Sequence, residues 1–200
     1  MLAKRQFDLA LSGVGLILSV PVWAAIALMI WFDDGWPILI RQERAGRGGR
    51  PFVALKFRSM VRGAERMSPK QDLDDDARVT RLGRWLRATA LDELPQLWNI
   101  FVGDMSFVGP RALAVTIEDQ ERVHFRTIYE IPGFVTRNRV PPGLTGVAQI
   151  YASKELPRRQ KFRYDLLYVR RCNFWLDLRL IALSFWITFR GKWEHRGQKL

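Results

Sequence analysis

RATALDELPQLWNIFVGDMSFVGPR, residues 87–111, is the stretch around which the rest of the chain is organised. It places two adjacent carboxylates, Asp92 and Glu93, shortly before Pro95 and an apolar run. Proline is best tolerated in the first turn of a helix, so the two acids are predicted at a helix N-terminus. Free N–H groups and the positive end of the helix dipole favour anions there. The same corner suits a phosphate, and Arg111 brings a bidentate cation if the chain folds back.

A plainer interpretation of the two acids stays open at this point. Asp92 and Glu93 fit equally well as an N-cap and a first-turn acid of an ordinary surface helix. The stretch alone does not choose between a phosphate site and a capped helix.

The whole chain of 200 residues is strongly basic, with 32 Lys and Arg against 20 Asp and Glu and a formal net charge of +12. Its length fits one domain with an appended membrane element. The charge predicts an anionic partner, which can be nucleic acid, anionic lipid head groups or phosphorylated substrates. The eight tryptophans favour contact with a lipid–water boundary, where this side chain is enriched.

The cysteine and histidine residues show whether a disulfide bond or a zinc site is expected. Cys172 is the single cysteine, so the chain forms no internal disulfide and a reducing compartment is allowed. His124 and His195 stand far apart in the sequence and have no cysteine partners, so no zinc site is predicted.

Residues 9–32 form an apolar run, after Lys4-Arg5, that is long enough for a membrane span of about 20 residues. The run is too long for the core of a signal peptide, and no clean cleavage site follows it. A plain span would place the basic body outside, against the positive-inside rule. Pro21 interrupts the helical hydrogen bonds, and a sharp kink there would return both ends to one face, with Ser19 able to satisfy a freed carbonyl. Periodicity does not distinguish a kinked span from such a re-entrant helix.

A short β-hairpin is predicted after the apolar run. Residues 38–40 and 52–55 resemble strands, and they flank the glycine-rich turn at residues 46–49. Basic residues such as Lys56 alternate with apolar ones here, and a solvated hairpin edge is the commoner use of that pattern.

Four other segments carry structural predictions. Residues 62–76 are polar and acidic and predict a solvated loop, because they lack the spacing of a calcium loop. Residues 112–126 predict a charged amphipathic helix, and residues 141–149 a tight loop that exposes its backbone. Residues 174–193 predict an interfacial helix, with a buried core helix as the alternative.

Several of these strings together resemble the bacterial sugar transferase family, the monotopic phosphoglycosyl transferases. The most specific are DELPQ at residues 92–96, GDMSFVGPR at residues 103–111 and PGLTG at residues 142–146. The resemblance covers nearly the whole chain and is of the small type that holds only the catalytic domain. It implies a membrane enzyme that transfers a phosphosugar from a UDP-sugar to polyprenyl (undecaprenyl) phosphate and releases UMP.

The resemblance also implies roles for the central residues. Asp92 matches the nucleophile that forms a covalent phosphosugar intermediate, and Glu93 matches the carboxylate that binds Mg²⁺. Arg111 matches a phosphate-gripping arginine, with the amide of Gly109 helping. An alternative route makes the same transfer in one displacement, without the covalent intermediate.

Other positions match the family motifs with less specific roles. Asp165 is either a pocket carboxylate or the ion-pair partner of a nearby arginine. The remaining positions implied to bind phosphate or substrate are Lys56, Arg78, Pro142, Gly143, Thr145 and Gly146.

The expected fold is mainly helical α+β, with residues 1–34 as a re-entrant membrane helix broken near Ser19 and Pro21, a short hairpin and interfacial amphipathic helices. Family members break this helix at a Ser-Pro pair, whereas Val20 precedes Pro21 here. Residues 35–200 would form one catalytic unit on the cytoplasmic face of the bacterial inner membrane.

The expected partners are a UDP-sugar, polyprenyl phosphate and membrane lipid, without nucleic acid, and a homodimer stays open. The rival from another class is a non-catalytic basic protein that binds anionic lipid or nucleic acid at a membrane surface. That protein would have no need of Asp92.

Overall fold

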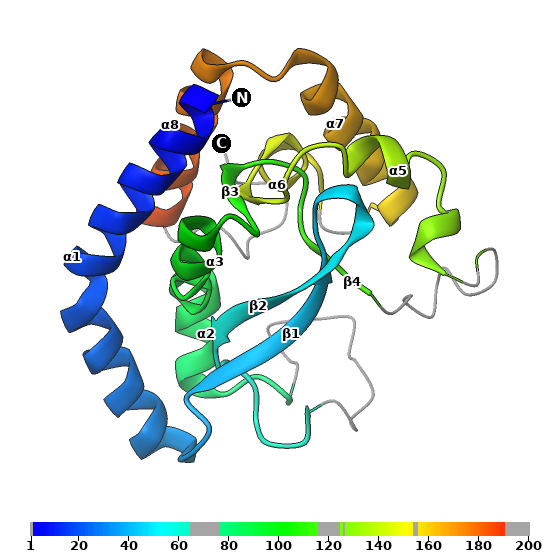
Figure 1. Cartoon of the computed structure of the whole chain (residues 1–200). Helices are drawn as coiled ribbons and strands as arrows, with labels where there is room; N and C mark the ends of the chain where they lie inside the picture. The colour runs from blue at the N-terminus through cyan, green and yellow to red at the C-terminus, as the bar shows by residue number, and fades with distance from the viewer. Residues whose placement is uncertain (1, 65–76, 116–124, 126, 154–155, 191–200) are drawn as a thin grey trace.

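The computed structural model describes residues 2–64, 77–115, 125, 127–153 and 156–190. These residues form a mainly helical α+β fold with two small sheets, which confirms the expected class (Figure 1). The helices and strands in chain order are α1 (Leu2–Asp34), β1 (Leu39–Ala45), β2 (Pro51–Phe57), α2 (Arg81–Ala88), α3 (Gln96–Val102), β3 (Ser106–Val108), β4 (Leu113–Ala114), α5 (Phe134–Arg137), β5 (Gly143–Thr145), α6 (Val147–Tyr151), α7 (Arg158–Arg171) and α8 (Phe174–Phe189).

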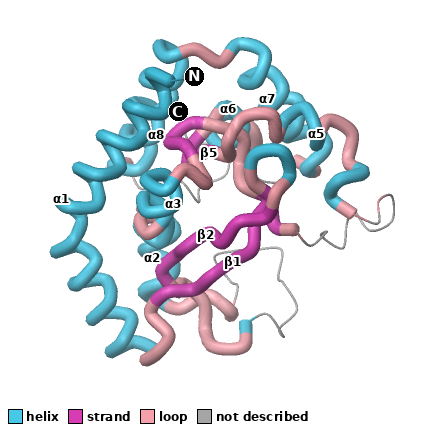
Figure 2. The backbone as a smooth tube through the Cα atoms, viewed as in Figure 1, coloured by secondary structure: helices cyan, strands magenta, loops and turns pink. Residues whose placement is uncertain are grey.

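The predicted hairpin is present, and both of its strands are longer than expected. β1 and β2 pair antiparallel from Leu39 opposite Phe57 to Ala45 opposite Pro51. Figure 2 shows the hairpin as a long twisted ribbon beside α2 and α3. The turn closes through Gly48 and Gly49, whose φ angles of 68° and 77° favour glycine.

The helix predicted over residues 112–126 is wrong at its start. Leu113 and Ala114 form the short strand β4, which pairs with Ala45 and Arg44 at the far edge of β1. The free backbone edge of β1 captures this segment, so hydrogen bonding between strands overrides the helical side-chain pattern. Residues 116–124 and 126 lie outside the described residues, as does the acidic part of the loop predicted over residues 62–76.

The segment predicted as an exposed loop at residues 141–149 is a buried strand followed by a helix. β5 pairs in parallel with β3, with Ser106 opposite Gly143 and Val108 opposite Thr145. α6 then begins at Val147, and its side chain packs in the main apolar core. The proline and glycine residues led to a loop prediction, whereas the parallel partner strand lies far away in the sequence.

α1 is a single helix of 33 residues, and Pro21 lies inside it without ending it. Figure 1 shows α1 bowed around α3 and α2. Ser19 Oγ donates to the carbonyl of Leu16 at 3.1 Å, not to the carbonyl of Ile17 that Pro21 deprives of its helical donor. Among the described residues α1 alone is long and apolar enough to cross a membrane, with a mean hydropathy of 2.3 over its most apolar window. Only 17% of that window is buried, unlike the core helix of a soluble protein.

Polar residues in the first turns of α1 fasten it to the rest of the domain. Arg5 donates through its two terminal nitrogens to the carbonyls of Ile100 and Phe101, each at 2.7 Å. These carbonyls belong to the last turn of α3, where helix C=O groups lack helical partners. Asp8 accepts the N–H of Phe107 in β3 at 3.2 Å, so the apolar helix also reaches the second sheet.

A second polar cluster joins α1 to α8. Lys4 Nζ lies 2.5 Å from Asp177 Oδ2 and 3.1 Å from the carbonyl of Val108. Tyr168 donates to Asp177 Oδ1 at 2.7 Å. Asp177 is buried, so this charge of the predicted interfacial helix faces the domain and not the solvent. Lys4 draws it inward, since a buried carboxylate needs a counter-charge.

The outer face of α8 carries large apolar side chains. Trp175, Phe185, Trp186 and Phe189 are all exposed on it. Arg179 is exposed as well, and the Arg190 guanidinium lies 5.5 Å from the centre of the Trp186 ring, so charged and apolar side chains share the exposed surface of the helix, as expected for an interfacial helix. Residues 191–200, which include Lys192 and Trp193 of that prediction, lie outside the described residues.

Candidate active site

A short helical turn between α2 and α3 places the two carboxylates. After α2 the chain reverses through Ala90, the single non-glycine residue with a positive φ (56°) in the described part of the chain. A 3-10 turn at Leu91–Glu93 follows, and Pro95 then stands at the N-cap of α3. The sequence correctly predicted a helix start here, although Asp92 and Glu93 lie in the preceding turn rather than inside the first turn of α3. Left-handed backbone at an alanine costs about 1 kcal/mol, a strain that is common beside functional groups.

Lys56 of β2 lies over both carboxylates. Its Nζ forms an ion pair with Glu93 Oε1 and lies 3.7 Å from Asp92 Oδ2. Asn99 of α3 holds β2 in place by accepting the N–H of Leu55 at 3.1 Å and donating to the carbonyl of Val53 at 2.8 Å. These bonds fix the register between the strand that carries Lys56 and the helix that follows the acids.

The environment separates the two carboxylates electrostatically. Burial raises the pKa of Asp92 to about 6, and Lys56 opposes that rise. Burial also acts on Glu93, but Lys56 and Arg111 outweigh it and lower the pKa of that carboxyl to about 2. Glu93 therefore stays ionised, whereas Asp92 is the more basic of the pair.

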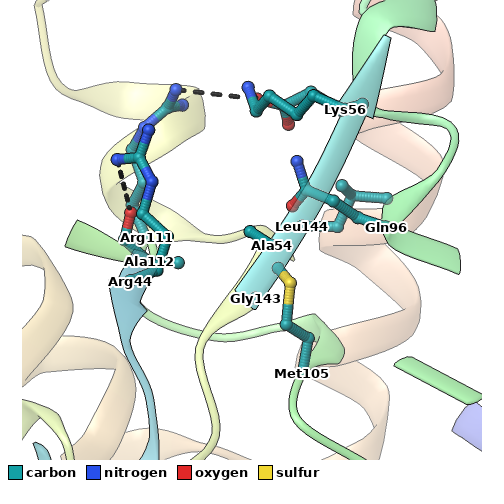
Figure 3. A pocket seen from close by; sticks show the side chains of 10 residues that line it. Arg44, Ala54, Lys56, Gln96, Met105, Arg111, Ala112, Gly143 and Leu144 are labelled. Atoms are coloured by element: carbon teal, nitrogen blue, oxygen red, sulfur yellow. Dashed lines mark hydrogen bonds and ion pairs between the residues drawn. The ribbon is translucent and has the colours of Figure 1, made fainter. Parts of the chain in front are cut away.

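Glu93 and Lys56 open onto a pocket that Arg111 faces from the opposite side (Figure 3). Arg111 Nη2 lies 3.7 Å from Glu93 Oε1, and the guanidinium is well exposed. The pocket is lined by Arg44, Ala54, Lys56, Glu93, Gln96, Met105, Arg111, Ala112, Gly143 and Leu144. Three cations and one ionised carboxylate on one pocket suit a polyanionic ligand such as a diphosphate.

The amide of Gly109 does not point at this pocket as a free phosphate donor. Its N–H donates to the carbonyl of Thr145 at 2.9 Å, and the N–H of Gly143 donates to the carbonyl of Pro110 at 2.9 Å. A Cβ on Gly143 would lie 2.0 Å from the nitrogen of Gly109, and a Cβ on Gly146 would lie 2.2 Å from its oxygen. These glycines therefore let β3 and β5 approach closely, and that approach supports the chain leading to Arg111.

The remaining predicted site residues lie behind the pocket or beside it. Pro142 accepts the N–H of Ser106 at 2.9 Å, and Thr145 is buried with its hydroxyl against that of Ser184. Arg78 lies on a separate segment, where its carbonyl accepts the N–H of Val61 at 2.8 Å. Of the predicted residues, the structure brings Lys56, Glu93, Arg111 and Gly143 together at the pocket surface, with Asp92 buried against Lys56.

Arg137 is a buried position behind the pocket that the sequence analysis missed. Its side chain is buried, donates to Asp165 Oδ2 at 2.9 Å and donates to the carbonyl of Arg111 at 2.7 Å. Its guanidinium also lies 4.7 Å from the centre of the Phe162 ring. Asp165 is thus the ion-pair partner of an arginine and does not line the pocket, so the second of its two predicted roles is the one observed. The pair holds the backbone of Arg111 from behind.

We predict that Asp165→Asn destabilises the fold by about 3–5 kcal/mol, because it leaves Arg137 buried without its counter-charge. Chemical denaturation in detergent would measure the loss. The matched control is Asp33→Asn, at an exposed carboxylate, which should change stability by less than about 0.5 kcal/mol. Equal stabilities of the two variants would contradict the structural role of the buried pair.

Comparison with known proteins identifies the family. The family described as bacterial sugar transferase matches residues 1–191. The chain is 39% identical to a UDP-glucose:undecaprenyl-phosphate glucose-1-phosphate transferase of Klebsiella pneumoniae, covering 96% of this chain and 41% of the relative. It is 41% identical to an undecaprenyl-phosphate glucose phosphotransferase of Komagataeibacter xylinus (92% and 35%). It is 36% identical to a UDP-N-acetylgalactosamine-undecaprenyl-phosphate N-acetylgalactosaminephosphotransferase of Aeromonas hydrophila (89% and 41%). The chain thus spans about two fifths of the length of these relatives, and it belongs to the bacterial sugar transferase family.

Proposed function

We propose that this chain transfers a phosphosugar from a UDP-sugar to polyprenyl phosphate at a membrane surface and releases UMP. The observation that carries the proposal is that Lys56 lies over both Asp92 and Glu93, beside a pocket that Glu93 lines and that Arg111 faces from the opposite side. The names of the relatives give the same reaction class, with glucose or N-acetylgalactosamine as the sugar. Two phosphorylated substrates also account for the net charge of +12 without nucleic acid.

The geometry supports a two-step mechanism. The Asp92 carboxylate attacks the β-phosphorus of the UDP-sugar, the bond from that phosphorus to the bridging oxygen breaks, and UMP leaves with the bond's electrons. A phosphate oxygen of the polyprenyl phosphate then attacks the aspartyl phosphosugar and frees the carboxylate. Covalent catalysis divides one difficult transfer into two easier ones, and the raised pKa of Asp92 increases its basicity as a nucleophile. Lys56 and Arg111 bind the phosphate oxygens during both steps.

Glu93 is the residue that would hold Mg²⁺. In the described part of the chain no group of three or more His, Cys, Asp or Glu side chains forms a metal cage. Mg²⁺ usually takes one or two carboxylates and completes its shell with substrate phosphates and water, so one pocket carboxylate fits this ion. When bound it would neutralise charge on the diphosphate. Glu93 is ionised and lines the pocket, so it can act as that ligand once Lys56 turns to the substrate.

The long apolar helix α1 indicates association with a membrane, which a polyprenyl substrate requires. We also propose a re-entrant arrangement, with the catalytic unit on the cytoplasmic face of the inner membrane. Two sets of contacts support the part of this proposal that keeps both ends of α1 on one side. The N-terminal end of α1 binds α3, β3 and α8 through Lys4, Arg5 and Asp8. At its other end Asp34 Oδ2 lies 3.1 Å from Arg58 Nη2, beyond the end of β2. A single folded body thus contacts both ends, whereas a straight span would separate them by a core of about 30 Å.

We predict that Asp92→Asn lowers UMP release by on the order of 10³-fold or more while the protein stays folded, because an amide cannot act as the nucleophile. The assay uses Mg²⁺, polyprenyl phosphate and a panel of UDP-sugars. Asp104→Asn, at an exposed carboxylate in the same stretch, serves as the control and should keep its activity. Full activity of Asp92→Asn would exclude Asp92 as nucleophile.

The same preparation separates the two-step route from a single displacement. Incubation with UDP-sugar alone should leave a phosphosugar mass on the peptide that contains Asp92, and the adduct should disappear when polyprenyl phosphate is added. An active enzyme that forms no adduct would follow the single-displacement route. A folded protein without activity on any sugar would instead favour a basic, membrane-binding protein without catalysis.

Metal removal provides an independent prediction. An excess of EDTA should abolish UMP release, and Mg²⁺ should restore it. Glu93→Gln should need a Mg²⁺ concentration at least about tenfold higher for half-maximal activity, because the variant loses a charged ligand. A metal requirement unchanged by Glu93→Gln would show that the ion is held elsewhere.

The topology can be tested through the single cysteine. In a Cys172→Ser background, a membrane-impermeant maleimide should fail to label Leu2→Cys or Asp33→Cys in intact spheroplasts and should label both after permeabilisation. Pro21→Ala should straighten α1 and expose one of the two positions to the outside, since the proline no longer interrupts the helical bonds. Labelling of either position from outside with Pro21 present would contradict the re-entrant arrangement.

A further inference from the structure

Arg44 is the third cation of the pocket, whereas the phosphate contacts of the proposed transfer come from Lys56 and Arg111. It lies on β1 opposite Phe52 of β2. Opposite residues share one face of a sheet, and so do residues two apart on one strand, so Arg44, Ala54 and Lys56 are on the same face. All three line the pocket. The hairpin thus presents two cations of the site on one surface.

Two hydrogen bonds orient the guanidinium of Arg44. Its Nη1 donates to the carbonyl of Ala112 at 3.4 Å, and its Nη2 donates to Gln42 Oε1 at 2.5 Å. Figure 3 shows Arg44 and Arg111 together on one side of the hollow, with Lys56 on the other side. The side chain is half-buried, so its charge acts within the pocket.

The contacts of the three cations give their order from the nucleophile. Lys56 Nζ lies 3.7 Å from Asp92 Oδ2, and Arg111 Nη2 lies 3.7 Å from Glu93 Oε1. Arg44 lies opposite residue 52, four positions before Lys56 on β2, which is about 13 Å at about 3.3 Å per residue. Against the effect of burial, the charge of Arg44 also lowers the pKa of Glu93, by less than the two other cations do. Because a Coulomb effect weakens with distance, Arg44 is the cation furthest from the carboxylates.

The direction of attack determines which phosphate approaches Arg44. In phosphoryl transfer the attacking and leaving oxygens lie roughly in line across the phosphorus. When Asp92 attacks the β-phosphorus, the bridging oxygen and the α-phosphate therefore lie on the side of that phosphorus away from Asp92. The α-phosphate thus extends toward the cation that is furthest from the carboxylates.

We propose that Arg44 binds the α-phosphate of the UDP-sugar and stabilises UMP as the leaving group. This inference rests on the proposed function. While the bond from Asp92 to the β-phosphorus forms, the bond from that phosphorus to the bridging oxygen breaks, and its electrons stay on the oxygen that UMP keeps. The phosphate of UMP therefore gains negative charge in this step, and a guanidinium placed there binds the transition state more strongly than the substrate.

The role of Arg44 would be confined to the first step. The aspartyl phosphosugar contains the β-phosphorus and the sugar but no α-phosphate, so its transfer to polyprenyl phosphate has no group for Arg44 to bind. Lys56 and Arg111 differ from Arg44 in this respect, because they contact the β-phosphate oxygens in both steps of the proposed mechanism.

The test measures the two steps separately. Rapid quenching follows the phosphosugar adduct after the enzyme is mixed with UDP-sugar and Mg²⁺. The adduct is then freed of nucleotide by desalting, and its loss is followed after polyprenyl phosphate is added. Wild type is compared with Arg44→Gln, Arg44→Lys and the control Arg41→Gln. Arg41 is exposed on the same strand and does not line the pocket.

We expect Arg44→Gln to slow adduct formation by about 10²- to 10³-fold, the effect of one donor to a developing negative charge. Transfer of the purified adduct should stay within about threefold of wild type. Arg44→Lys should recover part of the loss, since it keeps the charge without the paired donors of a guanidinium. Arg41→Gln should match wild type in both steps.

Equilibrium binding to the enzyme with Mg²⁺ gives a second readout, which needs no adduct. UMP should bind Arg44→Gln about 10- to 100-fold more weakly than wild type, because a hydrogen bond to a charged group is lost. Uridine has no phosphate and should bind both proteins equally. This comparison decides the inference if an active enzyme forms no adduct.

Two results would overturn the inference alone. Equal slowing of both steps, with UMP and uridine binding weakened together, would show that Arg44 only maintains the shape of the pocket. Unchanged adduct formation and UMP affinity in Arg44→Gln would remove Arg44 from nucleotide binding. A folded wild-type protein that releases no UMP from any UDP-sugar would overturn the proposed function, and this inference with it.

Discussion

One ammonium group placed over two buried carboxylates is the constraint on which this site depends. Asp92 and Glu93 are adjacent in the chain and both are largely shielded from water, so their charges repel in a medium that screens poorly. Lys56 compensates both, and it can do so only while β2 keeps its register against α3. The paired hydrogen bonds of Asn99 to β2 maintain that register. The carboxamide of Asn99 thus pairs with the backbone of β2 as a neighbouring strand would, next to the position of Lys56.

A second buried charge pair supports the opposite side of the pocket. Arg137 uses one guanidinium group to neutralise Asp165 and to bind the carbonyl of Arg111. The exposed side chain of Arg111 therefore projects from a backbone fixed from below. β3 and β5 reach the same backbone through glycines that permit unusually close contact. A fixed backbone below an exposed side chain would suit the phosphate-binding role proposed for Arg111.

The sequence predicted the parts of this structure that depend on neighbours along the chain. The hairpin follows from apolar alternation around a glycine turn, and the start of α3 follows from Pro95. The acid pair and Arg111 were identified from the family motif, and the structure places Glu93 and Arg111 at one pocket, with Asp92 buried against Lys56. The strand at Gly143–Thr145 was missed because its partner is β3, and no local signal distinguishes a buried parallel strand from a loop rich in glycine and proline. Arg137 was missed for a related reason. Nothing in the local sequence shows that a basic residue is buried, because its counter-charge, Asp165, lies 28 positions away. Lys4, Arg5 and Asp8, the charged residues just before the apolar run, were the visible signals that α1 binds polar groups of the domain.

The contact between the two ends of the chain has a consequence for biosynthesis. Lys4 and Asp177 are separated by 173 positions, and Lys4 bonds both to Asp177 and to the carbonyl of Val108, three residues before Arg111. During translation α1 leaves the ribosome long before α8 exists, so the strand leading to Arg111 receives this support only after α8 has been synthesised. A chain that stops before α8 would contain Asp92 and Glu93 but would lack the ion pair between Lys4 of α1 and Asp177 of α8. The order of synthesis would then complete the support of this strand only after the segments that carry both carboxylates have emerged.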